Sequence, residues 1–176
     1  MRALTLEQAV AVINGTFAEA AKLKLRPIAA VVLDSGGRVK AGMVQDRCSM
    51  LRFEVSRGKA YASLALGRPS RLVLAKAKEK PIFVDNLQGV ADQPLFLEGG
   101  GQLIRDAEGE VIGAIGVTGD VNEMDDIAAV AGIRSAGFKS DYDFTDADDI
   151  HRLNIKESKI PQPAAPQPAK TEPPKK

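Results

Sequence analysis

Histidine and cysteine are nearly absent from this sequence, which has one of each among its 176 residues. The single cysteine, Cys48, cannot form a disulfide within the chain. The single histidine, His151, lies near the C-terminus and leaves few ways to build a site that depends on imidazole. Tryptophan is missing, and the aromatic residues are two Tyr and six Phe. A core must therefore rest on Val, Ile, Leu and Ala.

The chain also lacks an excess of charge of either sign and any long apolar run. It has 24 Lys and Arg residues against 23 Asp and Glu residues, a net charge of +1. Nucleic-acid binding needs a clear basic excess, so no nucleic-acid partner is predicted. No apolar run approaches the roughly 18 residues of a membrane span, and the N-terminus lacks the apolar core of a signal peptide. These features predict a cytoplasmic protein without a membrane partner.

Hydrophobic periodicity and turn residues predict the secondary structure of most of the chain. The predicted elements are a helix at 6–24, strands at 28–33 and 39–43, helices at 49–66 and 71–79, strands at 102–105 and 110–118, and a helix at 122–136. The predicted N-caps of these helices are Thr5, Ser49, Ser70 and Asn122. Residues 82–100 are predicted to be irregular, and Gly137 to end the last helix. Hairpins combined with helices favour an antiparallel sheet and an α+β domain.

The composition changes after residue 140. Five aspartates follow in residues 141–155, which we interpret as an acidic extension of a domain at 1–140. Residues 156–176 contain six of the ten prolines and few apolar residues, so a disordered Pro-rich tail is predicted there.

The stretch "GAIGVTGD" at residues 113–120 raises the question of a phosphate-binding loop. Its glycines recur as G-x-x-G-x-x-G, whereas a dinucleotide fingerprint needs G-x-G-x-x-G and a P-loop needs a following Lys. A strand is the better interpretation. Glycine within a strand marks a close approach, here at Gly116, either by a packed helix or by a ligand or partner.

Several motifs in order resemble the GlcG/HbpS-like family, which includes the C-terminal domain of PduO-type proteins. They are "AAVVLDSGGRVKAGMVQDR" at 29–47, "GKAYASLALGRPSR" at 58–71, "EGGGQLIRDAEGEVIGAIGVTGD" at 98–120, Asp125-Asp126 and "AVAGIRSAGF" at 129–138. The resemblance covers about residues 5–140. It implies a profilin-like sandwich, with an antiparallel sheet flanked by helices, that forms homo-oligomers. Some members bind haem, one group is a haem-linked redox sensor, and many are encoded beside enzymes of catabolic pathways.

The sequence lacks one feature that is common in haem-binding sites, a well-placed histidine to bind the iron. No histidine precedes His151, which lies at the edge of the predicted tail. Other side chains that could bind iron are Cys48, Met43, Tyr61 and Tyr142. Cys48 lies just before a predicted helix, whose N-terminus would lower the pKa of the thiol. Met43 is equally interpreted as a core residue. Haem could also be held by an apolar surface with Arg or Lys bound to its propionates.

Three basic residues form the first candidate site for a small carboxylated ligand. Arg47 follows the first hairpin, while Arg52 and Lys59 are seven residues apart and share a face of one helix. Arginine binds carboxylates in a bidentate manner. Lys59 matches the family's lysine and lies among small residues, which predicts partial burial and a charged partner. A solvated helix face is the alternative.

The second candidate group is Glu98 with Gly99 and Gly100. Successive glycines let backbone N–H groups converge on an anion, although a flexible entry to the next strand explains them equally well. Asp120, at the end of "GAIGVTGD", either caps the last helix or pairs with Lys59 or an arginine. Asp125 and Asp126 suit the first turn of that helix without any further role. No spacing of acidic residues supports a metal site, and none is predicted.

Three functions are consistent with these residues. The first is an oligomeric protein that binds haem, another tetrapyrrole or a small carboxylated ligand. The second is a cofactor-independent enzyme acting on a small carboxylated metabolite, with Arg47 and Arg52 as the clamp, Lys59 as the base and Asp120 or Glu98 as the paired acid. The third is an interaction module that docks through its Pro-rich tail.

Overall fold

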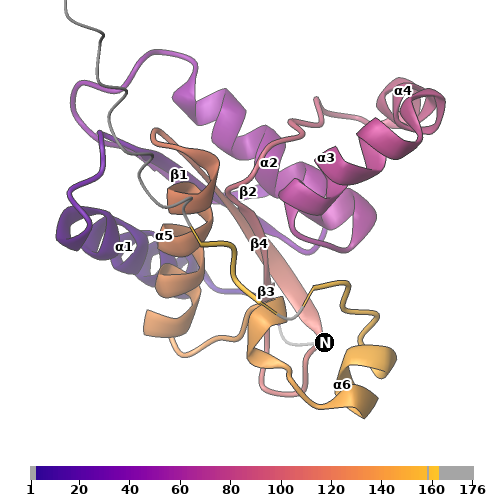
Figure 1. Cartoon of the computed structure of the whole chain (residues 1–176). Helices are drawn as coiled ribbons and strands as arrows, with labels where there is room; N and C mark the ends of the chain where they lie inside the picture. Colours follow the sequence, from indigo (N-terminus) through magenta and orange to yellow (C-terminus); the bar gives the residue numbers. More distant parts are fainter. Residues whose placement is uncertain (1–2, 158, 163–176) are drawn as a thin grey trace, which may run out of the picture.

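All the predicted helices and strands occur in the predicted order in the computed structural model, together with three further helices that were not predicted (Figure 1). The structure describes residues 3–157 and 159–162. The elements are α1 (Leu6–Lys22), β1 (Ala29–Asp34), β2 (Val39–Val44), α2 (Arg52–Leu66), α3 (Ser70–Glu79), α4 (Pro81–Val90), β3 (Gly101–Arg105), β4 (Val111–Thr118), α5 (Asn122–Ser135), the short 3-10 helix η1 (Asp141–Asp143) and α6 (Ala147–Arg152). Within the described residues, no helix combines the length and apolar character that a bilayer span requires.

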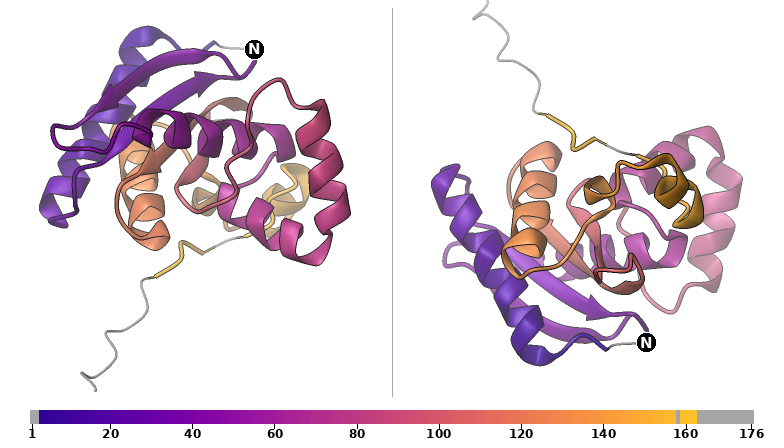
Figure 2. Two further views of the ribbon diagram at one scale, coloured as in Figure 1. Left: turned by 90° about the horizontal axis from the view of Figure 1, so that it is seen from above. Right: turned by 90° about the horizontal axis from the view of Figure 1, so that it is seen from below.

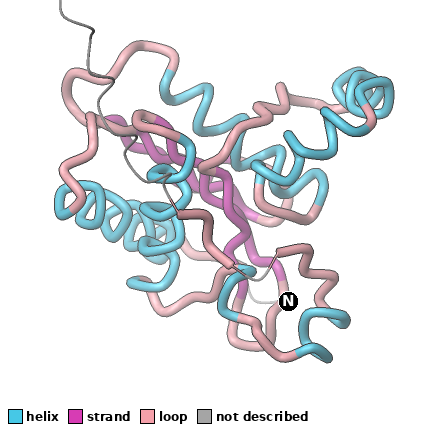
Figure 3. Tube along the Cα trace, in the orientation of Figure 1, coloured by secondary structure: helices cyan, strands magenta, loops and turns pink. Residues whose placement is uncertain are grey.

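The four strands form one antiparallel sheet in the order β2-β1-β4-β3. The two predicted hairpins, β1–β2 and β3–β4, therefore lie side by side, with β1 and β4 in the centre. Figure 3 shows the strands between helices on both sides. The prediction of an α+β fold with an antiparallel sheet flanked by helices is confirmed.

Each face of the sheet has its own apolar core. Helices α1 and α5 pack together over one face, as Figure 2 shows, and enclose the larger core with Ile13, Val32, Ile115 and Ile133. Helix α2 covers the other face, where a smaller core includes Leu33, Ala60 and Leu103. Both cores are almost entirely aliphatic, as the scarcity of aromatic residues predicts.

Gly116 explains how α2 lies so close to the sheet. A Cβ atom at this position would overlap the carbonyl oxygen of Ser56 and come within 2.8 Å of the backbone nitrogen of Ala60. The close approach expected in "GAIGVTGD" is therefore the approach of a helix backbone to the sheet. Of the two interpretations offered by the sequence, helix packing is the one that the structure supports.

Helix α4 was not expected. Residues 82–100 were predicted to be irregular, but residues 81–90 are helical. Pro81 is the reason for the error, because proline is unfavourable inside a helix yet suits the first position of one. Pro81 ends α3 and begins α4 in the same place. The rest of the range, up to Gly100, does lack helices and strands.

The predicted helix caps have mixed outcomes. Thr5 forms the predicted capping box with Gln8, and Gly137 adopts the predicted left-handed conformation with φ 80°. Ser49 does not cap α2, which begins after Leu51 without a side-chain cap. The expected caps of the two later helices also differ: Ser70 and Asn122 are the first helical residues of α3 and α5 rather than their N-caps.

The segment after α5 packs back on the domain. The backbone of Lys139 forms an isolated antiparallel β-bridge with that of Arg105 at the end of β3. The side chains of Tyr142, Phe144 and Ile155 are buried. The predicted acidic extension, 141–155, thus packs on the rest of the fold, and Glu157, at the start of the predicted tail, pairs with Arg71. The part of the predicted tail at 163–176 lies outside the described residues.

Candidate functional site

A buried lysine links the two faces of the domain. Lys59 lies on α2 with 1% of its surface exposed, between small neighbours that leave room for its long side chain. Its ammonium group donates to the carbonyl of Val117 and to a carboxylate oxygen of Asp125, both at 3.1 Å. The predicted burial and pairing of Lys59 are therefore observed. The partner is Asp125 on α5, not Asp120.

One glycine of the segment before β3, Gly100, does bind an anion through its N–H, and that anion belongs to the protein itself. The N–H of Gly100 donates to Asp126 at 2.7 Å, and the side-chain amide of Gln102 donates to the same oxygen at 2.6 Å. Gly100 has φ 112°, where a side chain would be strained. The Glu98 side chain is exposed, while its carbonyl accepts a hydrogen bond from the Ser70 hydroxyl. Gly99 is buried against Asn122.

Burial controls the electrostatics of this network. Removal from water raises the pKa of Asp125 to about 6, although Lys59 opposes the shift. Burial likewise raises the pKa of Asp126 to about 6 against its hydrogen bonds to Gly100 and Gln102. Arg71 lies 3.6 Å from the second Asp126 oxygen, which has no hydrogen-bond partner within the described residues. The cluster carries two carboxyls that take up protons more readily than usual.

These two carboxyls predict a pH dependence of stability. Because the pKa values are higher in the folded state, at about 6, than the ordinary 3.8, the folded state binds more protons than the unfolded chain between these limits. The contribution of Asp125 and Asp126 is most favourable at low pH and is lost as the pH rises through about 6. The free energy of unfolding, measured by urea titration, should register this loss between about pH 4 and pH 7.

The variant Asp126→Asn isolates one of the two groups. It keeps an oxygen that can accept from Gly100 but does not titrate, so its unfolding free energy should fall less than that of the wild type over the same pH range. Asp92→Asn, at an exposed position, is the matched control and should keep the wild-type profile. An Asp126→Asn profile parallel to that of the wild type would contradict the assignment.

The other candidate residues gather at one end of the sheet. Ala29 pairs with Val44 on one side and Thr118 on the other, so the segments around these three residues meet there. A guanidinium nitrogen of Arg52 donates to the Thr118 hydroxyl at 3.0 Å. Arg52 thus reaches the end of β4 next to the carbonyl that holds Lys59, but only Lys59 is fully buried.

Asp120 holds the chain at this same end. One of its oxygens accepts from the backbone N–H of Arg26 at 2.8 Å and lies 3.5 Å from the Arg26 guanidinium; the other accepts from the N–H of Val121. Burial acts to raise the pKa of Asp120, but these bonds and the charge of Arg26 together outweigh it and hold the pKa below its usual value. Of the roles weighed for Asp120, the contacts fit pairing with an arginine and support of the α5 entry.

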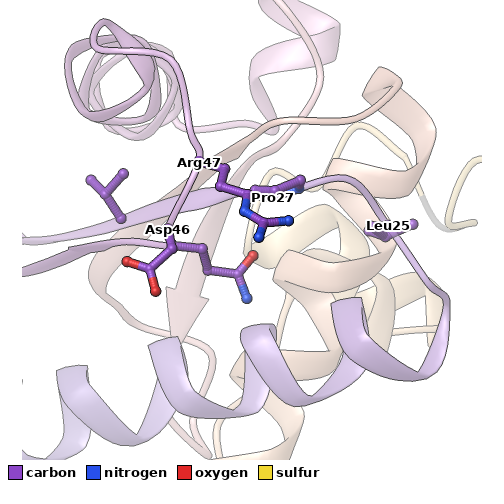
Figure 4. A pocket seen from close by; sticks show the side chains of 6 residues that line it. Leu25, Pro27, Asp46 and Arg47 are labelled. Carbon is purple, nitrogen blue, oxygen red and sulfur yellow. The ribbon is translucent and has the colours of Figure 1, made fainter.

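Arg47 lines a depression at this end of the sheet. We call it the sheet-end depression; its volume is about 630 Å³, and it is lined by Leu25, Pro27, Val44, Gln45, Asp46 and Arg47. Figure 4 shows the guanidinium of Arg47 beside Pro27, with the Asp46 carboxylate pointing away from it. Arg47 is exposed and has φ 70°. The structure therefore separates Arg47, on a surface, from Lys59, which is enclosed.

The possible iron ligands named from the sequence are scattered. Burial raises the pKa of the Cys48 thiol, so the predicted lowering is wrong; the helix does not begin until Arg52. Met43 packs against the larger core. Tyr142 is buried and donates to Glu157. His151 is exposed on α6. In the described part of the chain, no three His, Cys, Asp or Glu side chains are placed to hold a metal ion.

Sequence reasoning missed the acidic partners of the network. Asp125 and Asp126 were interpreted as first-turn residues that favour the helix dipole, yet both are completely buried. Their neighbours Arg71 and Gln102 were not singled out. The available signal was the combination of a predicted buried lysine with two adjacent aspartates, because a buried cation needs a charged partner.

Several solved structures share the fold of this chain. The chain superimposes on protein ORFY of Klebsiella pneumoniae with a TM-score of 0.68 and 22% identity, over 78% of this chain and 92% of that one. A structure described as a PduOC:haem complex matches with a TM-score of 0.68 and 18% identity, over 79% and 99%. HbpS matches with a TM-score of 0.66 and 24% identity, over 76% and 90%.

At these identities the structures show a shared fold and no more. No curated protein matches the sequence. A family model described as "Haem degrading protein HbpS-like" matches residues 4–134, which include both hairpins, the buried lysine and its aspartate partners. The chain therefore belongs to the HbpS-like family.

Proposed function

We propose that this protein binds haem or another tetrapyrrole in the sheet-end depression. The observation that carries the proposal is an exposed arginine that shares a depression of about 630 Å³ with three apolar residues, Leu25, Pro27 and Val44. Ligand sites of about 300–1,000 Å³ are typical for small molecules and cofactors. Membership of a family described by haem degradation, and a neighbour in the fold solved with haem, support this choice of ligand.

The lining residues fit the organic part of such a ligand. Leu25, Pro27 and Val44 offer apolar contacts to a flat macrocycle, and Arg47 offers a guanidinium to a propionate. Within the described residues, Arg47 forms no ion pair, so its charge is available to a ligand. The same contacts suit a smaller carboxylated ligand.

The lining of the sheet-end depression does not supply a usual ligand for the haem iron. None of the six lining residues is a His, Cys, Met or Tyr, the side chains that usually bind haem iron. Cys48 follows Arg47 directly and is half-buried. Haem would supply redox chemistry at its iron, whereas the residues here account for holding the macrocycle. The proposal is therefore one of binding.

The enzyme hypothesis receives less support from the geometry. Its proposed base, Lys59, is enclosed and paired with Asp125, and it does not line the sheet-end depression. Of its two proposed acids, Asp120 accepts a hydrogen bond from the backbone N–H of Arg26, and the Glu98 side chain is exposed. The catalytic roles of these residues, self-association, a catabolic context and a cytoplasmic location stay predictions.

A haemin titration tests the proposal. The wild type should produce a saturable Soret band distinct from that of free haemin. Arg47→Ala should weaken the apparent Kd about tenfold, as expected for the loss of one charge-assisted bond. Arg38→Ala, an exposed arginine in the turn between β1 and β2, is the matched control and should bind like the wild type. Non-saturating, aggregate-like spectra would overturn haem binding, and equal effects of the two substitutions would overturn the site.

A further inference from the structure

The segment that carries the only histidine is fixed to the domain at both ends. Before α6, the Asp141 carboxylate accepts from the Arg105 guanidinium at 2.6 Å, and both side chains are buried. After α6, Glu157 pairs with Arg71 and accepts from the Tyr142 hydroxyl. Because α6 lies between these two anchors, His151 belongs to a positioned surface. Its sequence position at the edge of the predicted tail gave no sign of this.

A second depression lies beside this helix. It has a volume of about 500 Å³, and its lining residues are Ala147, Ile150, His151, Asn154, Ile155 and Lys156; we call it the α6 depression. Asn154 turns the chain with φ 55°, a conformation that asparagine tolerates. This turn buries Ile155 and leaves Lys156 exposed, so the chain folds back over the end of α6.

The lining of the α6 depression combines two kinds of contact. Three residues are apolar: Ala147, Ile150 and Ile155. The other three carry hydrogen-bond donors: an imidazole, a side-chain amide and an ammonium group. None of the six carries a carboxylate. On the same helix Asp149 is paired with Arg152 at 2.7 Å, which partly neutralises the charge of that carboxylate.

We propose that the α6 depression binds a small organic carboxylate with an apolar body. The carboxylate accepts from His151 and Lys156, while its apolar part contacts Ile150 and Ile155. Residues 135–176 lie outside the match to the family model, so this site belongs to the C-terminal part of this chain.

The α6 depression is distinct from the sheet-end depression. Arg152, on α6, donates to the carbonyl of Glu108 in the turn between β3 and β4. That turn precedes β4, whereas the sheet-end depression lies where β4 ends, near Thr118. The two sites therefore lie at opposite ends of β4, and each can be tested without the other.

Ligand binding can be followed by NMR through the imidazole signals of His151. These signals are unambiguous because the chain contains a single histidine. Titration with hexanoate should shift these signals towards those of the protonated ring, since a nearby carboxylate favours the charged form. The shift should saturate with a Kd of about 1 mM or tighter. Hexanol and inorganic phosphate, which carry only the apolar or only the anionic part, should each bind at least about tenfold more weakly.

Three variants locate the site. Lys156→Ala should weaken hexanoate binding about tenfold, whereas Lys78→Ala, an exposed lysine on α3, should not change it. Arg47→Ala should also leave it unchanged, which separates this result from haemin binding. A non-saturating hexanoate shift, or an unchanged Kd in Lys156→Ala, would overturn the proposal. Equal affinity for phosphate or for hexanol would overturn its carboxylate-plus-apolar chemistry.

Discussion

Lys59→Met should destabilise the protein by about 3–5 kcal/mol at neutral pH, the loss typical of breaking a buried ion pair. Methionine approximates the volume of the lysine stem but leaves the Asp125 carboxylate, which is fully buried, without its cation. The carbonyl of Val117 loses a donor as well. The measurement is the free energy of unfolding from urea titration, and the loss is large against the 5–15 kcal/mol of an ordinary domain.

Two comparisons make this result specific. Lys76→Met removes a partly exposed lysine that pairs with Glu79 on α3, and it should cost less than about 1 kcal/mol. The double variant Lys59→Met/Asp125→Asn should be more stable than the single one, because the buried charge is gone. A double variant that loses the sum of the two single effects would show that the pair is not coupled.

This expectation also bears on the enzyme hypothesis. A catalytic role for Lys59 requires that Lys59→Ala keeps the fold and loses turnover. The contacts of Lys59 with α5 and β4 predict instead that the substitution acts first on stability. Activity lost together with the fold would not identify Lys59 as a catalytic residue.

Gly116→Ala should have an effect of similar size for a steric reason. The new methyl group would overlap the carbonyl oxygen of Ser56, and this atom belongs to the α2 backbone, which cannot rotate away as a side chain can. Helix α2 would have to move off the sheet, and with it Lys59. We expect a loss of about 3 kcal/mol or more, at the upper end for overpacked cores, measured by urea or thermal unfolding.

Gly89 offers the matched control. It lies within α4, and a Cβ atom there would meet nothing within 4 Å. Gly89→Ala should therefore be neutral or stabilise the protein by up to about 1 kcal/mol, since alanine is the better helix former. If Gly116→Ala unfolds at the same urea concentration as Gly89→Ala, the close packing of α2 on β4 is not tight in solution.

Much of the fold was accessible from local patterns. The capping box at Thr5, the turn residues of the two hairpins and the left-handed Gly137 each act within a few residues, so the sequence alone predicts them. The error at α4 was also local: Pro81 was interpreted as the end of one helix, when it can equally begin the next.

Only part of the candidate site could be predicted from the sequence. Burial of Lys59 followed from its small neighbours, but its partner lies 66 residues away on α5. The glycines before β3 were expected to meet an anion, and nothing local identified that anion as Asp126. Arg47 and Lys59 looked like one cluster in the sequence, whereas Arg47 is exposed in the segment before α2 and Lys59 is enclosed where α2 packs on the sheet.

The sequence by itself determined the α+β class, the strand pairing within each hairpin, the family and the need for a buried partner of Lys59, because these depend on short-range periodicity and on the chemistry of single residues. Only the tertiary structure decided which carboxylates are buried, where Arg47 opens to solvent, and that His151 lies on an anchored helix. Those properties depend on which distant segments exclude water from one another, and hydrophobic packing selects these segments over the whole chain.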